Sequence, residues 1–202
     1  FVALILFSIL QLFRDGLPFP SHFPAHAWFF LSLSGIVGFF IGDIFLFKAL
    51  VELGPRVAML IQSLAAPAAA IIGWLCLDEI YLFHQWAGMA IALSGVAIVI
   101  FERAKKTDPS AGQVSRKITP SGVGIGLVGM IGQAGGMVLS KVGMQTETGY
   151  LDAFSSTQIR AIAAFLCFVL FFTVTRRWQD VRAALANTKA VAFTAMGAGF
   201  GP

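Results

Sequence analysis

The fold is decided by the stretch AWFFLSLSGIVGFFIGDIFLF, residues 27–47. Its 21 residues include one ionisable side chain, Asp43. A helix needs about 20 apolar residues to cross the hydrocarbon core of a bilayer, which is roughly 30 Å thick. Lipid offers no partners to backbone N–H and C=O groups, and a helix pairs these groups within the segment itself. The stretch therefore predicts a transmembrane helix.

Similar apolar runs recur along the whole chain. They cover residues 1–13, 57–77, 80–101, 121–140 and 153–175, and a further run begins near Ala190. Of the 202 residues, 57% are hydrophobic and 12% are charged, against roughly 45–50% and about 25% in soluble domains. The runs are continuous rather than alternating, which disfavours a β-barrel. We therefore expect an all-α, polytopic transmembrane helical bundle with about seven segments.

The breaks between the runs suggest a division into two halves. The longest polar linker, residues 103–120, is basic and contains Pro109 and Gly112. We expect a first half at residues 1–102, this linker at residues 103–120, and a second half at residues 121–202. The chain starts with Phe1 in a run too short to cross a bilayer and stops within an apolar run. We therefore expect it to be an internal piece of a longer protein.

Polar residues within the apolar runs are the candidates for a site. An ionisable group in the membrane costs about 2.5–3.5 kcal/mol on insertion scales and requires a reason. A proline within a helix also frees a backbone carbonyl group, so we expect the run at residues 57–77 to bend near Pro67. Together these residues predict a central polar cavity that binds a solute, lined by Asp43, Gln62, Pro67, Gln133 and Arg160.

Each charged candidate has a simpler alternative. Asp43 could reach the membrane interface or pair with Lys48. Arg160 could be an interfacial anchor. The pair Asp78 and Glu79 ends one run just before the next begins. These two residues are expected to mark a tight helical hairpin, and in the simpler reading they form a turn at the surface.

Small residues follow helical spacing in several runs. Such stripes let helix backbones approach closely. Two readings stay open: the stripes serve packing alone, or they let helices slide or rock during transport. The candidates for packing and gating are Gly38, Gly42, Gly73, Gly132 and Gly136.

Several classes of function lack support in the sequence. No catalytic triad, zinc motif or nucleotide-binding loop is present. His22 and His26 lie in a Pro-rich loop, and Cys76 and Cys167 are expected to be inert core thiols. The net charge of +4 comes from loop residues, which favours membrane orientation over nucleic-acid binding. We expect no enzyme activity, no cofactor, no metal and no nucleic-acid partner.

The order and spacing of several short motifs resemble one EamA domain, the repeat of the drug/metabolite transporter superfamily. These motifs are GDIFLFKAL at residues 42–50, Gly54-Pro55-Arg56, QSLAAP at residues 62–67, GWLCLDE at residues 73–79, Gly88 and Ser94-Gly95. The later runs resemble the start of a second copy, in which Arg160 precedes an apolar run as in the family. The resemblance implies ten helices in two five-helix inverted repeats. This chain would then lack the first helix and the last two to three.

The resemblance also implies a function. Such a protein is a multi-pass permease of the plasma (inner) membrane, a secondary transporter or exporter. It moves a small metabolite or drug-like solute by alternating access, with a coupling proton or counter-solute left open. The alternatives are a non-transporting scaffold or receptor-like subunit, and last an intramembrane enzyme.

The basic residues predict an orientation. Loops expected on one side, which include the linker at residues 103–120, carry eleven of the fourteen Lys and Arg residues. The positive-inside rule places that side in the cytoplasm. The usual arrangement of the family implies the opposite side for the linker.

Overall fold

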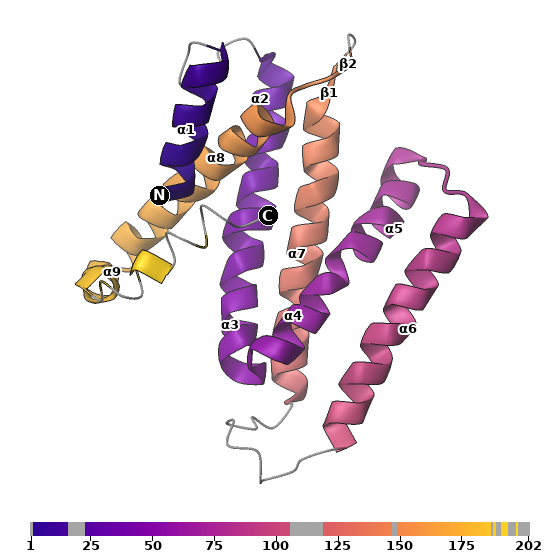
Figure 1. Cartoon of the computed structure of the whole chain (residues 1–202). Coiled ribbons are helices and arrows are strands. Elements are labelled where there is room, and N and C mark those ends of the chain that lie inside the picture. The colour runs from indigo at the N-terminus through magenta and orange to yellow at the C-terminus, as the bar shows by residue number, and fades with distance from the viewer. Residues whose placement is uncertain are drawn as a thin grey trace. The chain divides into compact units, whose positions relative to one another are not determined.

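A computed structural model describes residues 2–15, 23–105, 119–146, 149–186, 188, 191–193 and 197. The described chain is almost entirely helical (Figure 1). Its helices are α1 (Val2–Asp15), α2 (Ala25–Ser34), a π-helix (Gly35–Gly42), α3 (Asp43–Leu53), α4 (Pro55–Ser63), α5 (Ala65–Leu77), α6 (Phe83–Lys105), α7 (Pro120–Met144), α8 (Ala153–Val174) and α9 (Trp178–Ala186). Strands β1 (Gln145–Thr146) and β2 (Gly149–Tyr150) pair antiparallel.

Four helical stretches within the described residues are long and apolar enough to cross a membrane. They are Ala25–Leu53, Pro55–Leu77, Pro120–Met144 and Ala153–Val174. Shorter apolar stretches lie in α1 and α6, at Leu4–Phe13 and Phe83–Ile98. The prediction of an all-α, polytopic membrane protein is confirmed. The run predicted to begin near Ala190 lies mostly outside the described residues.

Two elements were not predicted. Helix α9 follows α8 after a three-residue turn, at a place where the sequence suggested a polar loop. Its Ala residues favour a helix, whereas Gln179 and Arg182 make it too polar for a membrane span. The hairpin of β1 and β2 contains two residues per strand and gave no period-2 signal.

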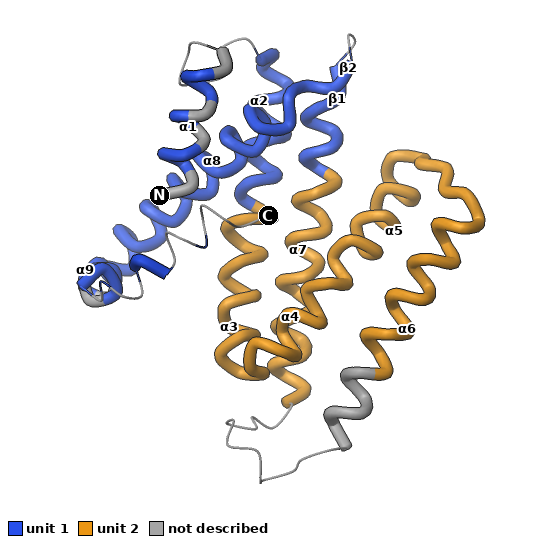
Figure 2. The backbone as a smooth tube through the Cα atoms, viewed as in Figure 1, with its two compact units in different colours: residues 1–36, 139–202 blue, residues 37–138 orange. Residues whose placement is uncertain are grey.

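The chain forms two compact units (Figure 2). Unit 1 contains residues 1–36 and 139–202, and unit 2 contains residues 37–138. The boundaries fall within two long helices, one in the π-helix and one in α7.

Unit 1 is built around the packing of α2 against α8. Its buried core residues are Ala27, Leu31 and Ile159. The end of α7 that belongs to unit 1 packs closely on α2, because a Cβ atom on Gly143 would lie 3.0 Å from Leu31 Cγ. Helix α8 begins after Asp152, whose Oδ2 accepts a hydrogen bond from the Ser155 N–H at 3.0 Å. Such an N-cap typically contributes about 1 kcal/mol.

Unit 2 is centred on α3, α4 and α7. Its buried apolar residues are Leu53, Val57, Ile61, Ala65 and Met130. Gly126 permits a close approach of α7 to α4, since a Cβ atom there would lie 3.1 Å from Ile61 Cδ1.

The segment at Pro55–Leu77 is broken as Pro67 predicts. Helix α4 ends at Ser63, and α5 begins at Ala65. Pro67 has no N–H to donate to the carbonyl of Ser63. The Leu64 N–H instead donates to the Ile61 carbonyl at 3.1 Å, which tightens the last turn of α4. The predicted bend in this segment is confirmed.

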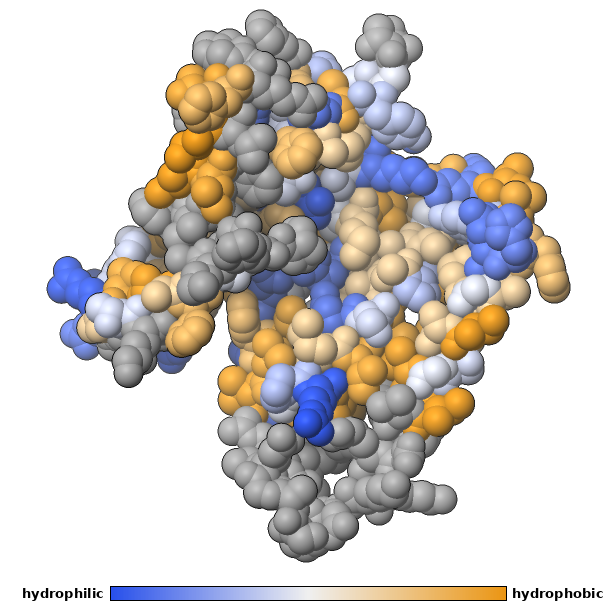
Figure 3. Space-filling view, viewed as in Figure 1, coloured by the Kyte–Doolittle hydropathy of each residue, from blue (hydrophilic) through white to orange (hydrophobic). Residues whose placement is uncertain are grey.

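Apolar side chains are exposed along the hairpin of α5 and α6 (Figure 3). They include Leu75, Ile80, Leu82, Phe83 and Ile91. A surface of this kind is stable in contact with lipid rather than water. Cys76 is also exposed on α5, so the expectation that it lies in the core is wrong: it sits on the outward face of its helix.

Candidate functional site

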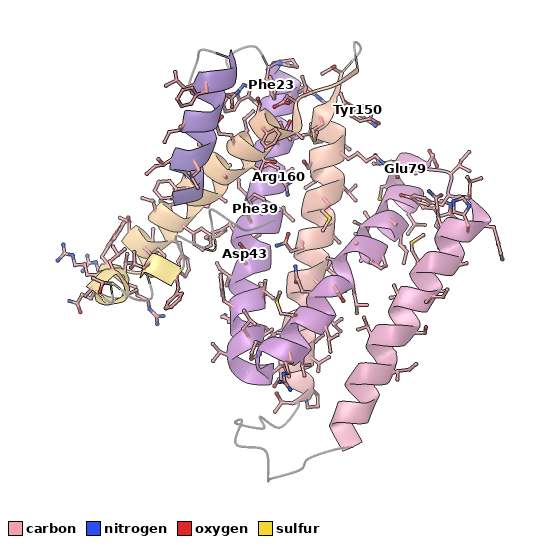
Figure 4. The ribbon with its side chains drawn as sticks, viewed as in Figure 1. Phe23, Phe39, Asp43, Glu79, Tyr150 and Arg160 are labelled. Carbon is pink, nitrogen blue, oxygen red and sulfur yellow. The ribbon has the colours of Figure 1, made fainter. Side chains whose placement is uncertain are left out.

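Asp43 and Gln133 meet within unit 2. Asp43 is the first residue of α3, and Gln133 lies in α7. The Gln133 Nε2 donates a hydrogen bond to Asp43 Oδ1 at 3.0 Å. Figure 4 shows Asp43 on the helix that continues from the π-helix. Two of the predicted site residues, 90 positions apart in sequence, therefore form one polar contact.

Glycines allow this contact by bringing the two helix backbones together. A Cβ atom on Gly42 would lie 3.3 Å from both the Cγ and the backbone N of Gln133. A Cβ atom on Gly132 would lie 3.2 Å from the Gly42 Cα, and one on Gly129 would lie 3.0 Å from the Leu46 N. We call Gly42, Gly129 and Gly132 the glycine seam. The sequence predicted Gly42 and Gly132 as packing residues, and it missed Gly129.

Asp43 lies well inside its helical stretch. Ten residues separate it from the end of α3 at Leu53, which corresponds to about 15 Å of helix. An Asp side chain is too short to reach across that length. Lys48 does not pair with it, since the Lys48 Nζ lies 5.6 Å from the centroid of the Phe45 ring. The alternative of a Lys48 partner is therefore wrong, and the partner of Asp43 is an uncharged amide.

Two opposing free-energy terms act on Asp43: the cost of placing it in a membrane-spanning helix and the gain from its hydrogen bond. An ionised carboxylate within a membrane-spanning helix costs about 2.5–3.5 kcal/mol. A hydrogen bond to a charged group returns roughly 1.5–3 kcal/mol. Because the two terms are of similar size, the hydrogen bond from Gln133 offsets much of the cost of placing Asp43 in this helix.

The π-helix directly precedes Asp43. It spans Gly35–Gly42, eight residues, longer than the single π-turn that is usual within α-helices. Such turns are frequent at functional sites, because they widen the helix and displace backbone groups. Gly38 is buried within this π-helix, and Gly136 is buried in α7. The sequence pattern gave no indication of a π-helix.

Gln62 and Pro67 flank the break between α4 and α5. The Gln62 Oε1 is buried and has no hydrogen-bond partner among the described residues. Pro67 is buried in the first turn of α5. Both residues belong to unit 2, as do Asp43 and Gln133.

Arg160 belongs to unit 1. It lies in α8, directly against α2, because a Cβ atom on Gly35 would lie 2.2 Å from the Arg160 carbonyl oxygen. Arg160 is half-buried rather than exposed. It is labelled in Figure 4.

A second polar arrangement joins α1 and α8 in unit 1. The Gln11 Nε2 donates to the Ser155 Oγ at 2.7 Å, and the Gln158 Nε2 donates to the Ser8 Oγ at 3.1 Å. Ser8 and Gln11 are three residues apart, as are Ser155 and Gln158, so each pair shares a helix face. We call these four residues the polar ladder. This arrangement was not predicted, although the matched three-residue spacing is a visible signal in the sequence.

The predicted hairpin motif forms a compact turn at the end of α5. Asp78 is exposed and adopts a left-handed backbone with φ of 51°. Glu79 folds back over Gly73, where a Cβ atom would lie 3.1 Å from the Glu79 Oε2. A side chain at position 73 would meet the ends of the Glu79 and Tyr81 side chains. Glu79 is labelled at this turn in Figure 4.

Aromatic residues complete the turn. The Tyr81 hydroxyl donates to the Glu79 Oε2 at 2.5 Å. This hydrogen bond, with the nearby carboxylate charge, raises the pKa of Tyr81 to about 12. The Trp86 ring packs edge-to-face against Trp74, with centroids 5.4 Å apart, and against Tyr81 at 6.2 Å. Asp78 and Glu79 thus act within a hairpin turn.

Within the residues that the structure describes, no group of three His, Cys, Asp or Glu side chains is placed to hold a metal ion. His26 packs on Phe30 with ring centroids 4.6 Å apart, and His22 lies outside the described residues.

Comparison with known proteins agrees with the architecture. The EamA-like transporter family matches residues 1–101, which is half of the chain. No curated protein and no solved structure gave a match. The matched range contains Asp43, Gln62, Pro67 and the hairpin turn. The chain is a multi-pass membrane protein and belongs to the EamA-like transporter family.

Proposed function

We propose that the protein is a secondary transporter that moves a small polar or drug-like solute by alternating access. The observation that carries this proposal is the contact of Asp43 with Gln133 inside a helical stretch long enough to cross a membrane. A helix that serves only as an anchor has no need of a half-buried carboxylate about 15 Å from its end.

Three further features support movement of the helices near the Asp43–Gln133 contact. The glycine seam brings two backbones together without interlocking side chains. The π-helix beside the seam is eight residues long, and π-turns within helices are frequent at functional sites. The break before Pro67 divides a neighbouring segment into two shorter helices. Broken helices near mid-membrane polar groups are typical of transporter binding sites.

The proposal also covers the residues that contact the solute, the second repeat and the membrane in which the protein acts. The solute contacts Asp43, Gln133 and the Gln62 amide, all of which lie in unit 2. For Arg160, which lies in unit 1, a role in solute binding stays a prediction. Residues 121–202 begin a second, inverted repeat after the basic linker. The protein acts in the plasma (inner) membrane, it carries out no chemical reaction on the solute, and a scaffold or receptor-like subunit is the rival function.

Uptake into proteoliposomes tests the proposal. The complete protein is reconstituted, and the vesicles are offered radiolabelled amino acids, nucleosides, sugars and quaternary amines. We expect at least one class to enter faster than into protein-free vesicles. Asp43→Asn should abolish that uptake. Glu52→Gln, the same chemical change at an exposed position of the same helix, should preserve it.

The outcome separates the rival functions. If no solute class enters faster than into protein-free vesicles, transport is refuted for those classes. That result would favour the rival function, a scaffold or receptor-like subunit. If Asp43→Asn transports as well as the wild type does, the protein is a transporter whose solute site lies elsewhere.

A further inference from the structure

The two carboxylate oxygens of Asp43 differ in their contact with Gln133. This difference bears on which ion drives transport. The amide donates to one carboxylate oxygen, Oδ1. The other oxygen, Oδ2, is left to accept a proton, and protonation there leaves the hydrogen bond at Oδ1 intact. The same contact thus persists in the ionised and in the neutral form of Asp43.

Among the residues of unit 2 whose side chains the structure describes, no basic side chain compensates the charge of Asp43. On α3, Lys48 is directed to Phe45, and Glu52 is exposed. The adjacent helix α4 carries Arg56, which is exposed, and residues 120–138 of α7 contain no titratable side chain. A carboxylate without a nearby cation in low-dielectric surroundings is neutralised by binding a proton or a cationic ligand.

The surroundings favour a proton over a metal cation. A monovalent or divalent metal ion takes several oxygen ligands, whereas Gln133 presents its N–H group to the carboxylate. A metal ion at this place would have to displace that donor. A proton requires one oxygen lone pair and no rearrangement.

We propose that Asp43 is a proton-binding site whose protonation changes during the transport cycle, with Gln133 as its positioning residue. This inference rests on the proposed transport function and adds the coupling ion to it. Protonation removes the charge from the helix, so it lowers the cost of moving the glycine seam through apolar surroundings. Release of the proton then requires that the site open toward water.

Labelling with dicyclohexylcarbodiimide tests this directly, without knowledge of the solute. The reagent enters membranes and reacts with protonated carboxylic acids. The acid proton goes to a carbodiimide nitrogen, and the carboxylate oxygen bonds to the central carbon. The O-acylisourea that forms rearranges to a stable N-acylurea, which peptide mass spectrometry locates. The complete protein in native membranes is labelled over a range of pH.

We expect modification of Asp43 that declines as the pH rises, and no modification of the exposed Glu52 at neutral pH. Gln133→Leu removes a donor that favours the ionised form, so it should increase labelling of Asp43 at a given pH. Asp43→Glu keeps the carboxyl group and should remain labelled, whereas Asp43→Asn should not. An Asp43 that stays unmodified at every pH, or is modified equally at all of them, would overturn the proposal.

The labelling experiment tests proton binding and the uptake experiment tests transport, so a negative result in one does not imply a negative result in the other. If a solute enters vesicles while Asp43 stays unmodified, transport stands and proton binding at Asp43 is refuted. If Asp43 is labelled as expected but Asp43→Asn vesicles take up solute as the wild type does, Asp43 binds a proton outside the transport cycle, and the coupling is refuted.

Discussion

Gly35 lies directly against the backbone of Arg160 in unit 1. A Cβ atom on Gly35 would be 2.2 Å from the Arg160 carbonyl oxygen and 2.9 Å from its Cα. Backbone atoms cannot rotate away as a flexible side chain can, so the helices would have to separate. The packing of α2 on α8 therefore depends on the absence of a side chain at this residue.

Gly35→Ala should lower the free energy of unfolding by about 1–3 kcal/mol, as expected for overpacking of a close contact. Gly88→Ala is the matched control, because nothing lies within 4 Å of its Cβ position on α6. Alanine there should be neutral or stabilising by up to about 1 kcal/mol, through helix propensity. Thermal unfolding in detergent measures both, and equal effects of the two changes would contradict the close contact.

The polar ladder should couple α1 energetically to α8. Gln11→Leu and Ser155→Ala each break the 2.7 Å hydrogen bond between these residues. In a double-mutant cycle the two changes should be less than additive, with a coupling of about 0.6 kcal/mol and at most about 1.7 kcal/mol. Additive effects would mean that the hydrogen bond contributes nothing to the association of α1 with α8.

The hairpin turn should show a shifted tyrosine titration. The Tyr81 hydroxyl, which donates to Glu79, ionises near pH 12 instead of its usual 10.0. Since the folded state holds this proton more tightly, the turn's contribution to stability is complete below pH 10 and is lost as the pH rises toward 12. Glu79→Gln should move the tyrosinate absorbance to lower pH.

Tyr81→Phe identifies which absorbance belongs to this residue, because the chain contains one other tyrosine, Tyr150. An absorbance change that is identical in the wild type and in Glu79→Gln would show that the carboxylate does not act on Tyr81.

The basic linker predicts the orientation of the protein. Most Lys and Arg residues lie in loops expected on its side of the membrane, so we expect the linker in the cytoplasm. Ser110→Cys, placed in a protein without Cys76 and Cys167, should resist a membrane-impermeant thiol reagent in intact cells and react after lysis. Reaction in intact cells would instead agree with the arrangement that the family resemblance implies.

The membrane-spanning segments could be read from the sequence because apolar run length is a local property. The stretch at residues 27–47 extends in the structure to Ala25–Leu53. This extension matters for Asp43, which the shorter run placed near a helix end. The helix continues for ten residues beyond it, so Asp43 lies farther from the helix end than the apolar run indicated.

Pairing between distant residues could not be predicted. Asp43 and Gln133 were each recognised by their polarity in an apolar run, but 90 residues separate them, and their contact depends on how α3 packs against α7. Ser8 and Gln11 were overlooked for another reason. Serine and glutamine are common in helices, and one hydrogen bond per side chain reduces the cost of burying them.

Accessibility of position 133 from the two sides of the membrane tests the central claim, alternating access at the Asp43–Gln133 contact, most directly. Gln133→Cys in a protein without Cys76 and Cys167 is exposed to an impermeant thiol reagent in right-side-out and in inside-out vesicles. Leu127→Cys, at an exposed position of the same helix, is the control and should react from at most one side. Alternating access predicts that Cys at position 133 reacts from both sides. Reaction from neither side, or from one side only, would contradict it.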